Sequence, residues 1–215
     1  VGVGVVNRYL VRDEGCILID TGMPYTRGLL TRALGRLGIH PEEIRLIVLT
    51  HGHVDHAGAA RAIQELTGAR IAVHHRDQAL LEQGLVVMPP LRTATGRWMQ
   101  AVLEPVLRLL HFPPARADIV VGDEGLSLAE FGIRGRVIHT PGHSHGSVSI
   151  LLDTGEAFVG DLASGGILLR GSPRLPPEAE DPPQIVASWR RLLAEGAQAS
   201  YPGHGRPFPA ELIRP

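Results

Sequence analysis

Three histidines and an aspartate fall within six positions of the stretch LTHGHVDHAG. They are His51, His53, Asp55 and His56. Imidazole nitrogens and carboxylate oxygens are ligands that zinc, iron and manganese accept. In the His-x-His step, alternate residues of an extended turn can point the same way, so that two ligands reach one ion. The spacing favours a metal site over the alternative, a solvated polar loop in a chain with 11 histidines.

Three further residues of ligand type stand in glycine turns or directly after predicted strands. His143 lies in HTPGHSHGS, Asp161 follows EAFVG, and His204 lies in YPGHG. Loops at the carboxyl ends of strands can converge on a site without disturbing the core. A binuclear site needs about seven or eight protein ligands and a bridging group. With these three residues the chain offers seven candidates.

The elements that would position these residues follow an α/β pattern, in which apolar runs alternate with helix-like segments. The run IRLIVLT, which directly precedes His51 and is apolar except for Arg45 and Thr50, is typical of a strand buried on both faces. Further strands are expected over residues 2–11, 15–22 and 70–75, several more from 118 onward, and helices over 26–39, 57–68 and 183–196.

The segment 76–117 differs in character from the rest, because prolines punctuate it and a helix is expected over 95–112. Trp98, Val102 and Val106 would share one apolar face, and Pro105 should kink or divide the helix. Such a face is typical of core, of a dimer interface, or of a lid over the site. We prefer the lid, because the segment enters between two of the ligand-bearing stretches.

Composition indicates one globular domain spanning residues 1–215, since 44% of the residues are hydrophobic. The net charge of −1 gives no support for a nucleic-acid or membrane partner. All 21 basic residues are arginine, which excludes lysine Schiff-base chemistry. The single cysteine, Cys16, lies in an apolar run and is interpreted as a core residue. The chain shows no signal-peptide layout after Val1, so a cytoplasmic location is expected.

The ordered motifs closely resemble those of the metallo-β-lactamase superfamily. His51, His53, Asp55 and His56 match its H-x-H-x-D-H motif, while His143, Asp161 and His204 match its later ligands. LIDTG, with Asp20, is similar to its early strand and turn. The resemblance implies an α/β fold, an αββα four-layer sandwich of two mixed β-sheets face to face with helices outside.

The same resemblance implies the roles of the ligands. His51, His53 and His143 would hold a first metal ion, Asp55, His56 and His204 a second, and Asp161 would bridge the two. Two zinc ions are expected, with iron or manganese as alternatives. The implied activity is that of a binuclear metal-dependent hydrolase, in which a metal-bound hydroxide, oriented by Asp55, attacks a small ester, thioester, lactone or related substrate.

Other activities known in the superfamily remain open. Glyoxalase II enzymes have similar metal motifs and a C-terminal helical domain, whereas only 11 residues follow His204 here. Persulfide dioxygenases bind one iron through residues matching His51, His143 and Asp161. A β-lactamase, a phosphodiesterase and a metal-dependent binding protein without catalysis are further alternatives. The expected partner is a small molecule, with neither nucleic acid nor membrane, and a homodimer is left open.

A few residues outside the motif are given supporting roles. Asp20 and His139 are expected to orient metal ligands from behind. His145 could face the pocket as an acid or substrate contact, and Arg170 could meet an anionic substrate. His74 and the neighbouring His75 are interpreted as surface or packing residues.

Overall fold

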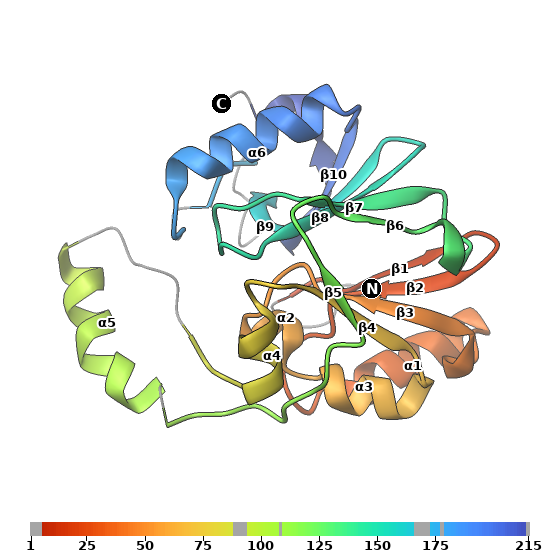
Figure 1. Ribbon diagram of the computed structural model, residues 1–215, viewed down its shortest axis with the longest axis horizontal. Coiled ribbons are helices and arrows are strands. Elements are labelled where there is room, and N and C mark those ends of the chain that lie inside the picture. Colours follow the sequence, from red (N-terminus) through yellow and green to blue (C-terminus); the bar gives the residue numbers. More distant parts are fainter. Residues whose placement is uncertain (1–5, 88–93, 108, 166–172, 177–178, 214–215) are drawn as a thin grey trace.

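Two β-sheets pack face to face, and helices cover the outer side of each (Figure 1). The computed structural model describes residues 6–87, 94–107, 109–165, 173–176 and 179–213. In spatial order the first sheet contains β1 (Tyr9–Arg12), β2 (Cys16–Ile19), β3 (Ile44–Val48), β4 (Arg70–His74) and β5 (Ile119–Val121). The second contains β11 (Phe208–Pro209), β10 (Ala199–Gly205), β9 (Glu156–Gly165), β8 (Val148–Leu152), β7 (Gly135–His139) and β6 (Leu126–Ser127).

Both sheets are mixed. In the first, β2 to β5 pair in parallel and only β1 runs antiparallel to its neighbour β2. In the second, only β9 and β10 pair in parallel. The expected αββα sandwich is therefore confirmed.

The helices are α1 (Arg27–Leu37), α2 (Val54–Ala57), α3 (Ala60–Thr67), α4 (Gln78–Gln83), α5 (Ala94–Leu107) and α6 (Pro182–Ala194). Short 3-10 turns lie at η1 (Pro41–Glu43), η2 (Ala129–Phe131) and η3 (Ala210–Leu212). No helix among the described residues is both long and apolar enough to cross a membrane. Helix α1 ends where its sequence predicts, because Gly38 takes the left-handed conformation, with a φ of 65°, that closes a helix.

Strand alternation divides the apolar residues between two layers. On β3, Leu46 and Val48 face the second sheet, while Ile47 faces the helices. On β2, Ile17 likewise packs between the sheets and Leu18 packs toward α1 and α3. Because successive strand side chains point to opposite faces, an uninterrupted apolar run serves both layers at once. On the far side, α6 packs on the second sheet through residues such as Trp189, whose indole Nε1 donates a hydrogen bond to the Ile213 carbonyl at 3.1 Å.

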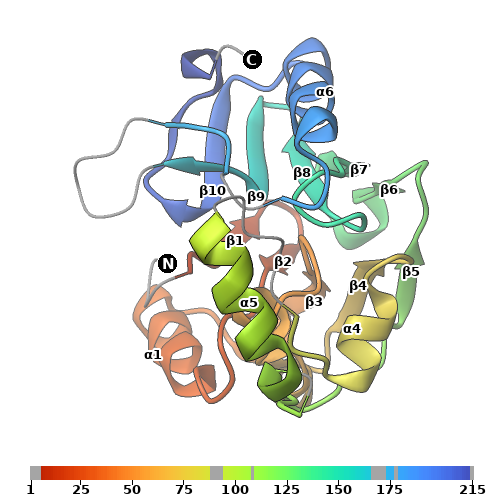
Figure 2. The ribbon, with the colours of Figure 1, turned by 90° about the vertical axis from the view of Figure 1, so that its left-hand side faces the viewer.

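Helix α5 stands apart from both sheets, beyond the rim where α2 and β9 lie (Figures 1 and 2). Its apolar side chains are on the surface, since Trp98 is 70% exposed and Val102 and Val106 are each 55% exposed. The interpretation of this helix as core is therefore wrong. Pro105 lies inside the helix and does not divide it.

The layered core yields a test of the fold. Leu46 is fully buried between the sheets, so Leu46→Ala should lower the free energy of unfolding by about 2–5 kcal/mol, through lost transfer energy and the cavity left behind. Arg45 is exposed on the same strand and serves as the control. Arg45→Ala should change the free energy of unfolding by less than about 0.5 kcal/mol. Urea unfolding of both variants measures the difference. Equal effects of the two changes would show that β3 does not lie between the layers.

Candidate metal centre

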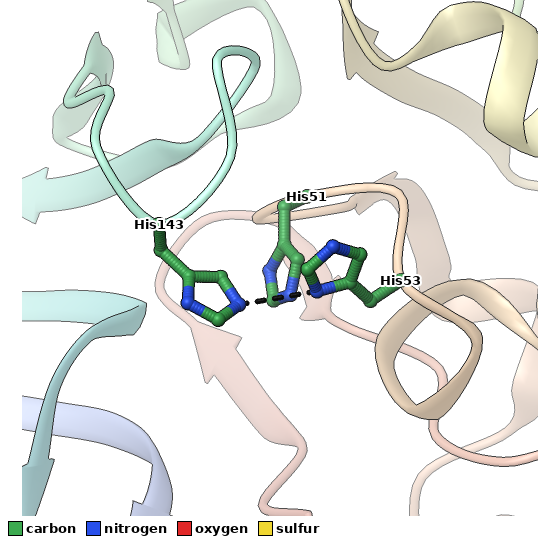
Figure 3. Close-up of side chains that lie close together, drawn as sticks. All are labelled: His51, His53 and His143. Atoms are coloured by element: carbon green, nitrogen blue, oxygen red, sulfur yellow. Dashed lines mark hydrogen bonds between the residues drawn. The ribbon is translucent and has the colours of Figure 1, made fainter. Parts of the chain in front are cut away.

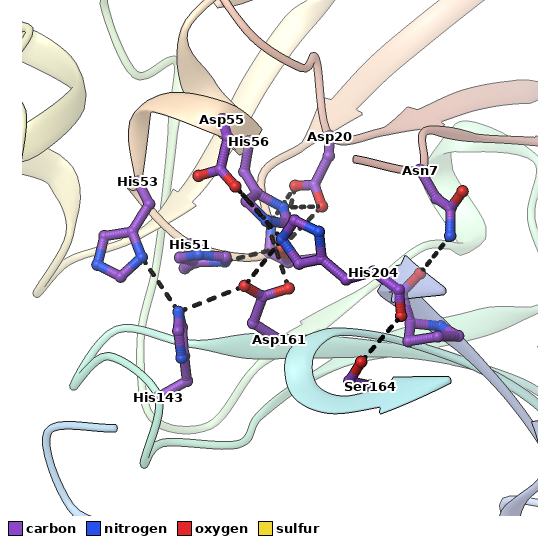
Figure 4. A network of polar contacts seen from close by, with 12 residues as sticks. Asn7, Asp20, His51, His53, Asp55, His56, His143, Asp161, Ser164 and His204 are labelled. Atoms are coloured by element: carbon purple, nitrogen blue, oxygen red, sulfur yellow. Dashed lines mark hydrogen bonds and ion pairs between the residues drawn. The ribbon is translucent and has the colours of Figure 1, made fainter. Parts of the chain in front are cut away.

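The seven ligand-type residues of the sequence come together at one rim of the sandwich, where the two sheets meet (Figure 4). The first sheet supplies His51 in the loop after β3, His53 at the start of α2, and Asp55 and His56 within α2. The second sheet supplies His143 in the loop after β7, Asp161 within β9 and His204 within β10.

Two details of this placement differ from the sequence-based expectation. The stretch after His53 is a short helix rather than an extended loop, so Asp55 and His56 lie within α2. Asp161 and His204 lie inside strands, and not beyond their ends. Pairing of β9 with β10 shifts register on both sides of Pro202, and such irregularities re-aim side chains next to a site.

The first group of ligands consists of three histidines that face one another (Figure 3). The ring centroids of His51 and His53 lie 4.6 Å apart, and those of His53 and His143 lie 4.9 Å apart. His143 Nε2 lies 3.1 Å from His53 Nδ1. One nitrogen from each of the three rings falls within a common span of 4.8 Å. Three imidazoles at this spacing can hold one ion.

The second group consists of Asp55, His56 and His204. Asp55 Oδ2 lies 3.7 Å from His56 Nε2 and 3.3 Å from His204 Nε2. Asp161 lies between the groups: its Oδ1 is 3.4 Å from His56 Nε2, and its Oδ2 is 3.5 Å from His143 Nε2 and 3.3 Å from His204 Nε2. This carboxylate therefore faces ligands of both groups.

Unpaired polar atoms indicate that the centre suits cations. Among the described residues, His51 Nε2, His56 Nε2 and Asp161 Oδ1 are buried without a hydrogen-bond partner. Buried polar atoms seldom lack partners in folded proteins, and leaving them unpaired is costly. Nitrogen and carboxylate oxygen atoms directed at a shared space are the donor set of zinc and iron, so the residues fit metal ions.

Two histidines of the first group, His51 and His53, are in the protonation state that binds metal. Burial, together with neighbouring histidines, lowers the pKa of His51 well below its usual value. Burial and the nearby His143 lower the pKa of His53 to about 3. Both rings are therefore neutral near pH 7, and a neutral imidazole offers its lone pair to a cation.

The second group holds positive charge even without metal. Burial disfavours the charged form of His56, but Asp161 and Asp20 outweigh it and raise its pKa well above the usual value. Against the same effect of burial, Asp161 and Asp55 raise the pKa of His204 to about 10. Protons here occupy positions suited to cations, and metal binding displaces such protons.

Asp20 lies behind the second group and contacts its His56. Its Oδ1 accepts the Thr50 amide hydrogen at 2.8 Å, and its Oδ2 lies 2.8 Å from His56 Nδ1. A carboxylate on one ring nitrogen fixes the direction of the other, here Nε2, toward a cation. Asp20 adopts a φ of 59°, an uncommon conformation for a residue other than glycine.

Two residues that hold the ligand loops were missed in the sequence. Asp77, which is 3% exposed, accepts hydrogen bonds from the Gly52 amide and the Ser144 hydroxyl, both at 2.8 Å, and so joins the loop of His51 to that of His143. Asn7 Nδ2 donates to two carbonyls close to His204 on either side, those of Pro202 at 3.0 Å and Gly205 at 2.7 Å. Neither residue stands in a motif, so no local pattern marks it.

Two other predicted residues, His139 and His145, lie away from the seven. His139 contacts His74, Asp123 and the His145 carbonyl instead of a metal ligand, so its expected support of the centre is at most indirect. The side chain of His145 is 66% exposed and lies 3.6 Å from Glu180. Arg170 lies outside the described residues.

The main chain of β10 forms one wall of the centre. A Cβ added to Gly203 would lie 2.5 Å from Asp161 Oδ1 and 2.6 Å from His56 Cε1. Only a residue without a side chain leaves both in place, because contacts this short do not occur in proteins.

Comparison with known proteins agrees with this geometry. The family model described as the metallo-beta-lactamase superfamily matches residues 1–204. Metallo-beta-lactamase domain-containing protein 1 of Mus musculus is 30% identical over 201 residues, which cover 91% of this chain and 61% of that protein. The protein named "Probable metallo-hydrolase MJ0888", from Methanocaldococcus jannaschii, is 29% identical over 210 residues, covering 93% of this chain and 87% of that protein. The chain spans about 60% of the length of the first two curated relatives.

Solved structures give the same result for the fold. TTHA1623 in a di-iron-bound form is 30% identical, with a TM-score of 0.67 and coverage of 99% of this chain and 94% of that one. The metallo-beta-lactamase family protein TTHA1429 from Thermus thermophilus is 26% identical, with a TM-score of 0.68 and coverage of 96% and 70%. The family model, the relatives and the fold agree with the motifs of the sequence: the chain belongs to the metallo-β-lactamase superfamily.

Proposed function

We propose that the protein is a binuclear metal-dependent hydrolase acting on a small ester, thioester, lactone or related substrate. The observation that carries the proposal is the placement of Asp161 between two separate ligand groups. His51, His53 and His143 would hold one ion, Asp55, His56 and His204 the other, and Asp161 would bridge them. The relatives named as metallo-hydrolases support hydrolysis as the reaction class.

The second ligand group argues against a site with one metal. A mononuclear iron dioxygenase would use His51, His143 and Asp161, and would leave Asp55 and His204 without a ligand role. Yet Asp55 Oδ2 lies 3.3 Å from His204 Nε2 and 3.7 Å from His56 Nε2, so these residues converge as the ligands of a second ion would. We propose zinc as the resident metal, with iron as the alternative that the di-iron form of TTHA1623 supports.

Bound metal ions would supply two kinds of chemistry, a lowered water pKa of about 7 and polarisation of the electrophile. The chain's own contribution is position and charge. The Asp55 side chain is 30% exposed, against 14% for Asp161, so it is the carboxylate better placed to orient an attacking water and take its proton. Asp161, deeper in the centre, would hold the two ligand groups together.

The position and exposed apolar side of helix α5 indicate a class of substrate. The helix stands beyond the rim that carries the ligands, and Trp98, Val102 and Val106 are exposed on it (Figure 2). We propose that it is a lid whose apolar side contacts a hydrophobic part of the substrate, since binding sites combine apolar walls with a few polar groups.

Metal content tests the binuclear centre. Purified protein should hold two ions per chain, and Asp55→Ala or His204→Ala should each reduce this toward one, because each removes a ligand of the second ion only. Esterase and lactonase activity should fall by more than the roughly 10- to 100-fold that is typical when a residue supporting a metal ligand is removed. Elemental analysis measures the metal content, and a panel of ester and lactone substrates measures the activity. One iron per chain, with oxygen uptake on a persulfide, would instead select the dioxygenase.

The support from Asp20 can be tested separately from the ligands. Asp20→Asn removes the charge that orients His56, so we expect metal affinity to fall by about 10- to 100-fold with the fold retained. Asp153→Asn, on an exposed turn, is the matched control and should leave affinity unchanged. Competition with a chromophoric chelator measures affinity. Unchanged affinity in Asp20→Asn would contradict this role.

The lid is tested by making its apolar side polar. Trp98→Ser should raise KM for esters of long-chain acids about 10-fold and leave metal content unchanged, because lost apolar contact weakens binding without touching the centre. Leu212→Ser changes a comparably exposed apolar residue elsewhere, 56% exposed, and serves as control. Steady-state kinetics on short- and long-chain esters give KM for each variant. Equal KM values in the variants would remove α5 from the binding site.

A further inference from the structure

A second set of metal-type ligands lies outside the seven residues of the centre. His74 is the last residue of β4, His139 is the last residue of β7, and Asp123 lies in the turn between β5 and β6. Asp123 Oδ1 is 3.2 Å from His74 Nε2 and 3.3 Å from His139 Nδ1. One ligand atom from each residue falls within a common span of 4.8 Å. Three segments far apart in the chain therefore bring two nitrogens and an oxygen to one place.

A backbone carbonyl fixes which ring nitrogen of His139 faces Asp123. His139 Nε2 lies 3.0 Å from the His145 carbonyl oxygen, which can only accept a hydrogen bond. Nε2 must therefore carry the hydrogen, and in the neutral ring Nδ1 presents a lone pair toward the Asp123 carboxylate. A lone pair facing a carboxylate is repulsive unless a positive charge lies between them. Histidine ligands commonly donate their other N–H to a backbone carbonyl in this way.

His74 offers the second nitrogen. The residue is fully buried, and its Nε2 has no hydrogen-bond partner among the residues that the structure describes. Burial, with His139 and His75 close by, lowers the pKa of His74 to about 4, so the ring is neutral near pH 7. Its Nδ1 accepts a long hydrogen bond from the Arg76 amide at 3.4 Å, so a cation bound at Nε2 must displace the ring hydrogen that otherwise points toward Asp123.

Asp123 supplies the negative charge of the site and lies where an ion can reach it from solvent. Its Oδ2 accepts a hydrogen bond from Arg76 Nη2 at 2.9 Å, which fixes the carboxylate and leaves Oδ1 toward the two rings. The Asp123 side chain is 56% exposed, so an ion can enter and keep water as further ligands. Two imidazoles and one carboxylate with open positions suit zinc and related divalent ions. The nearby Arg76 charge repels a cation, so binding should be weaker than at the main centre.

The rings must move when an ion binds. In the metal-free arrangement, His74 and His139 are stacked, with centroids 4.1 Å apart and planes inclined by 10°. A coordinated ion lies near the plane of each imidazole, along its lone pair. Two nearly parallel rings cannot both meet that condition, so binding should tilt one against the other.

We propose that His74, Asp123 and His139 form an additional binding site for a divalent transition-metal ion such as zinc, separate from the seven-residue centre. His74 belongs to the first sheet and His139 to the second, so the ion ties the two sheets together. His139 also begins the loop that carries His143, and the tie therefore lies beside the main centre. Its role is positional and stabilising, since Asp123 and both rings are distinct from the proposed catalytic group.

Zinc content of full-length variants tests the proposal. After equilibration with a modest excess of zinc, the unchanged protein should hold one ion more per chain than Asp123→Ala. Asp153→Ala, a change at another exposed aspartate, should match the unchanged protein. His139→Gln should lose the same ion, and circular dichroism verifies that each variant is folded. Equal zinc content in all of these proteins would overturn the proposal.

Crystals of the zinc-loaded protein locate the ion. Anomalous scattering at the zinc edge should show a peak among His74 Nε2, Asp123 Oδ1 and His139 Nδ1, with the angle between the rings opened beyond 10°. A peak that forms only at zinc concentrations far above that of the protein would mark an adventitious ion and overturn the site. The same anomalous map shows independently whether the main centre holds metal. An empty main centre beside a filled Asp123 site would contradict the binuclear hydrolase and support this proposal.

Discussion

The buried carboxylate of Asp20 is the constraint on which the centre depends. An ionised carboxylate inside a protein is stable only if hydrogen bonds and opposite charge replace the water it has lost. Asp20 finds these partners in the Thr50 amide, the Thr50 hydroxyl and His56, all of them in or beside the ligand stretch. The first sheet thereby fixes the path of the chain into α2. Once that path is set, the direction of the His56 ring follows from it.

The second sheet completes the arrangement from the other side. Asp161 and His204 reach the rim because pairing between β9 and β10 is irregular near Pro202, and Asn7 holds the backbone around His204 from the first sheet's side. Asp77 adds a further connection, since it binds the backbone of one ligand loop and a side chain of the other. The centre is thus a joint between the sheets, and the ligands cannot take their places until both sheets have packed.

Much of this could be predicted because the information is local. The four-residue motif from His51 to His56 sits at the end of an apolar strand, and glycines or prolines flank each of the later ligands, so their convergence could be expected. That Asp161 and His204 lie inside strands could not, because it depends on the irregular pairing of β9 with β10. The contacts of His139 with His74 could not be predicted in this way. They join residues 65 positions apart, on two different sheets, and only packing decides which face of each strand end is buried. The exposure of the apolar side of α5 could not be predicted for a related reason. Helical periodicity shows that one face is apolar but does not show what covers that face.

The wall formed by Gly203 limits how the protein can change. With main chain directly against Asp161 and His56, the metal side of the centre has no room for a new side chain. Variation among related chains, whether by evolution or by design, is therefore confined to the opposite side, where surface loops and α5 carry residues that the core does not need. With α5 as the proposed lid, reactivity would depend on the rim of the two sheets and selectivity on a separate part of the chain, so that one could be altered while the other stays the same.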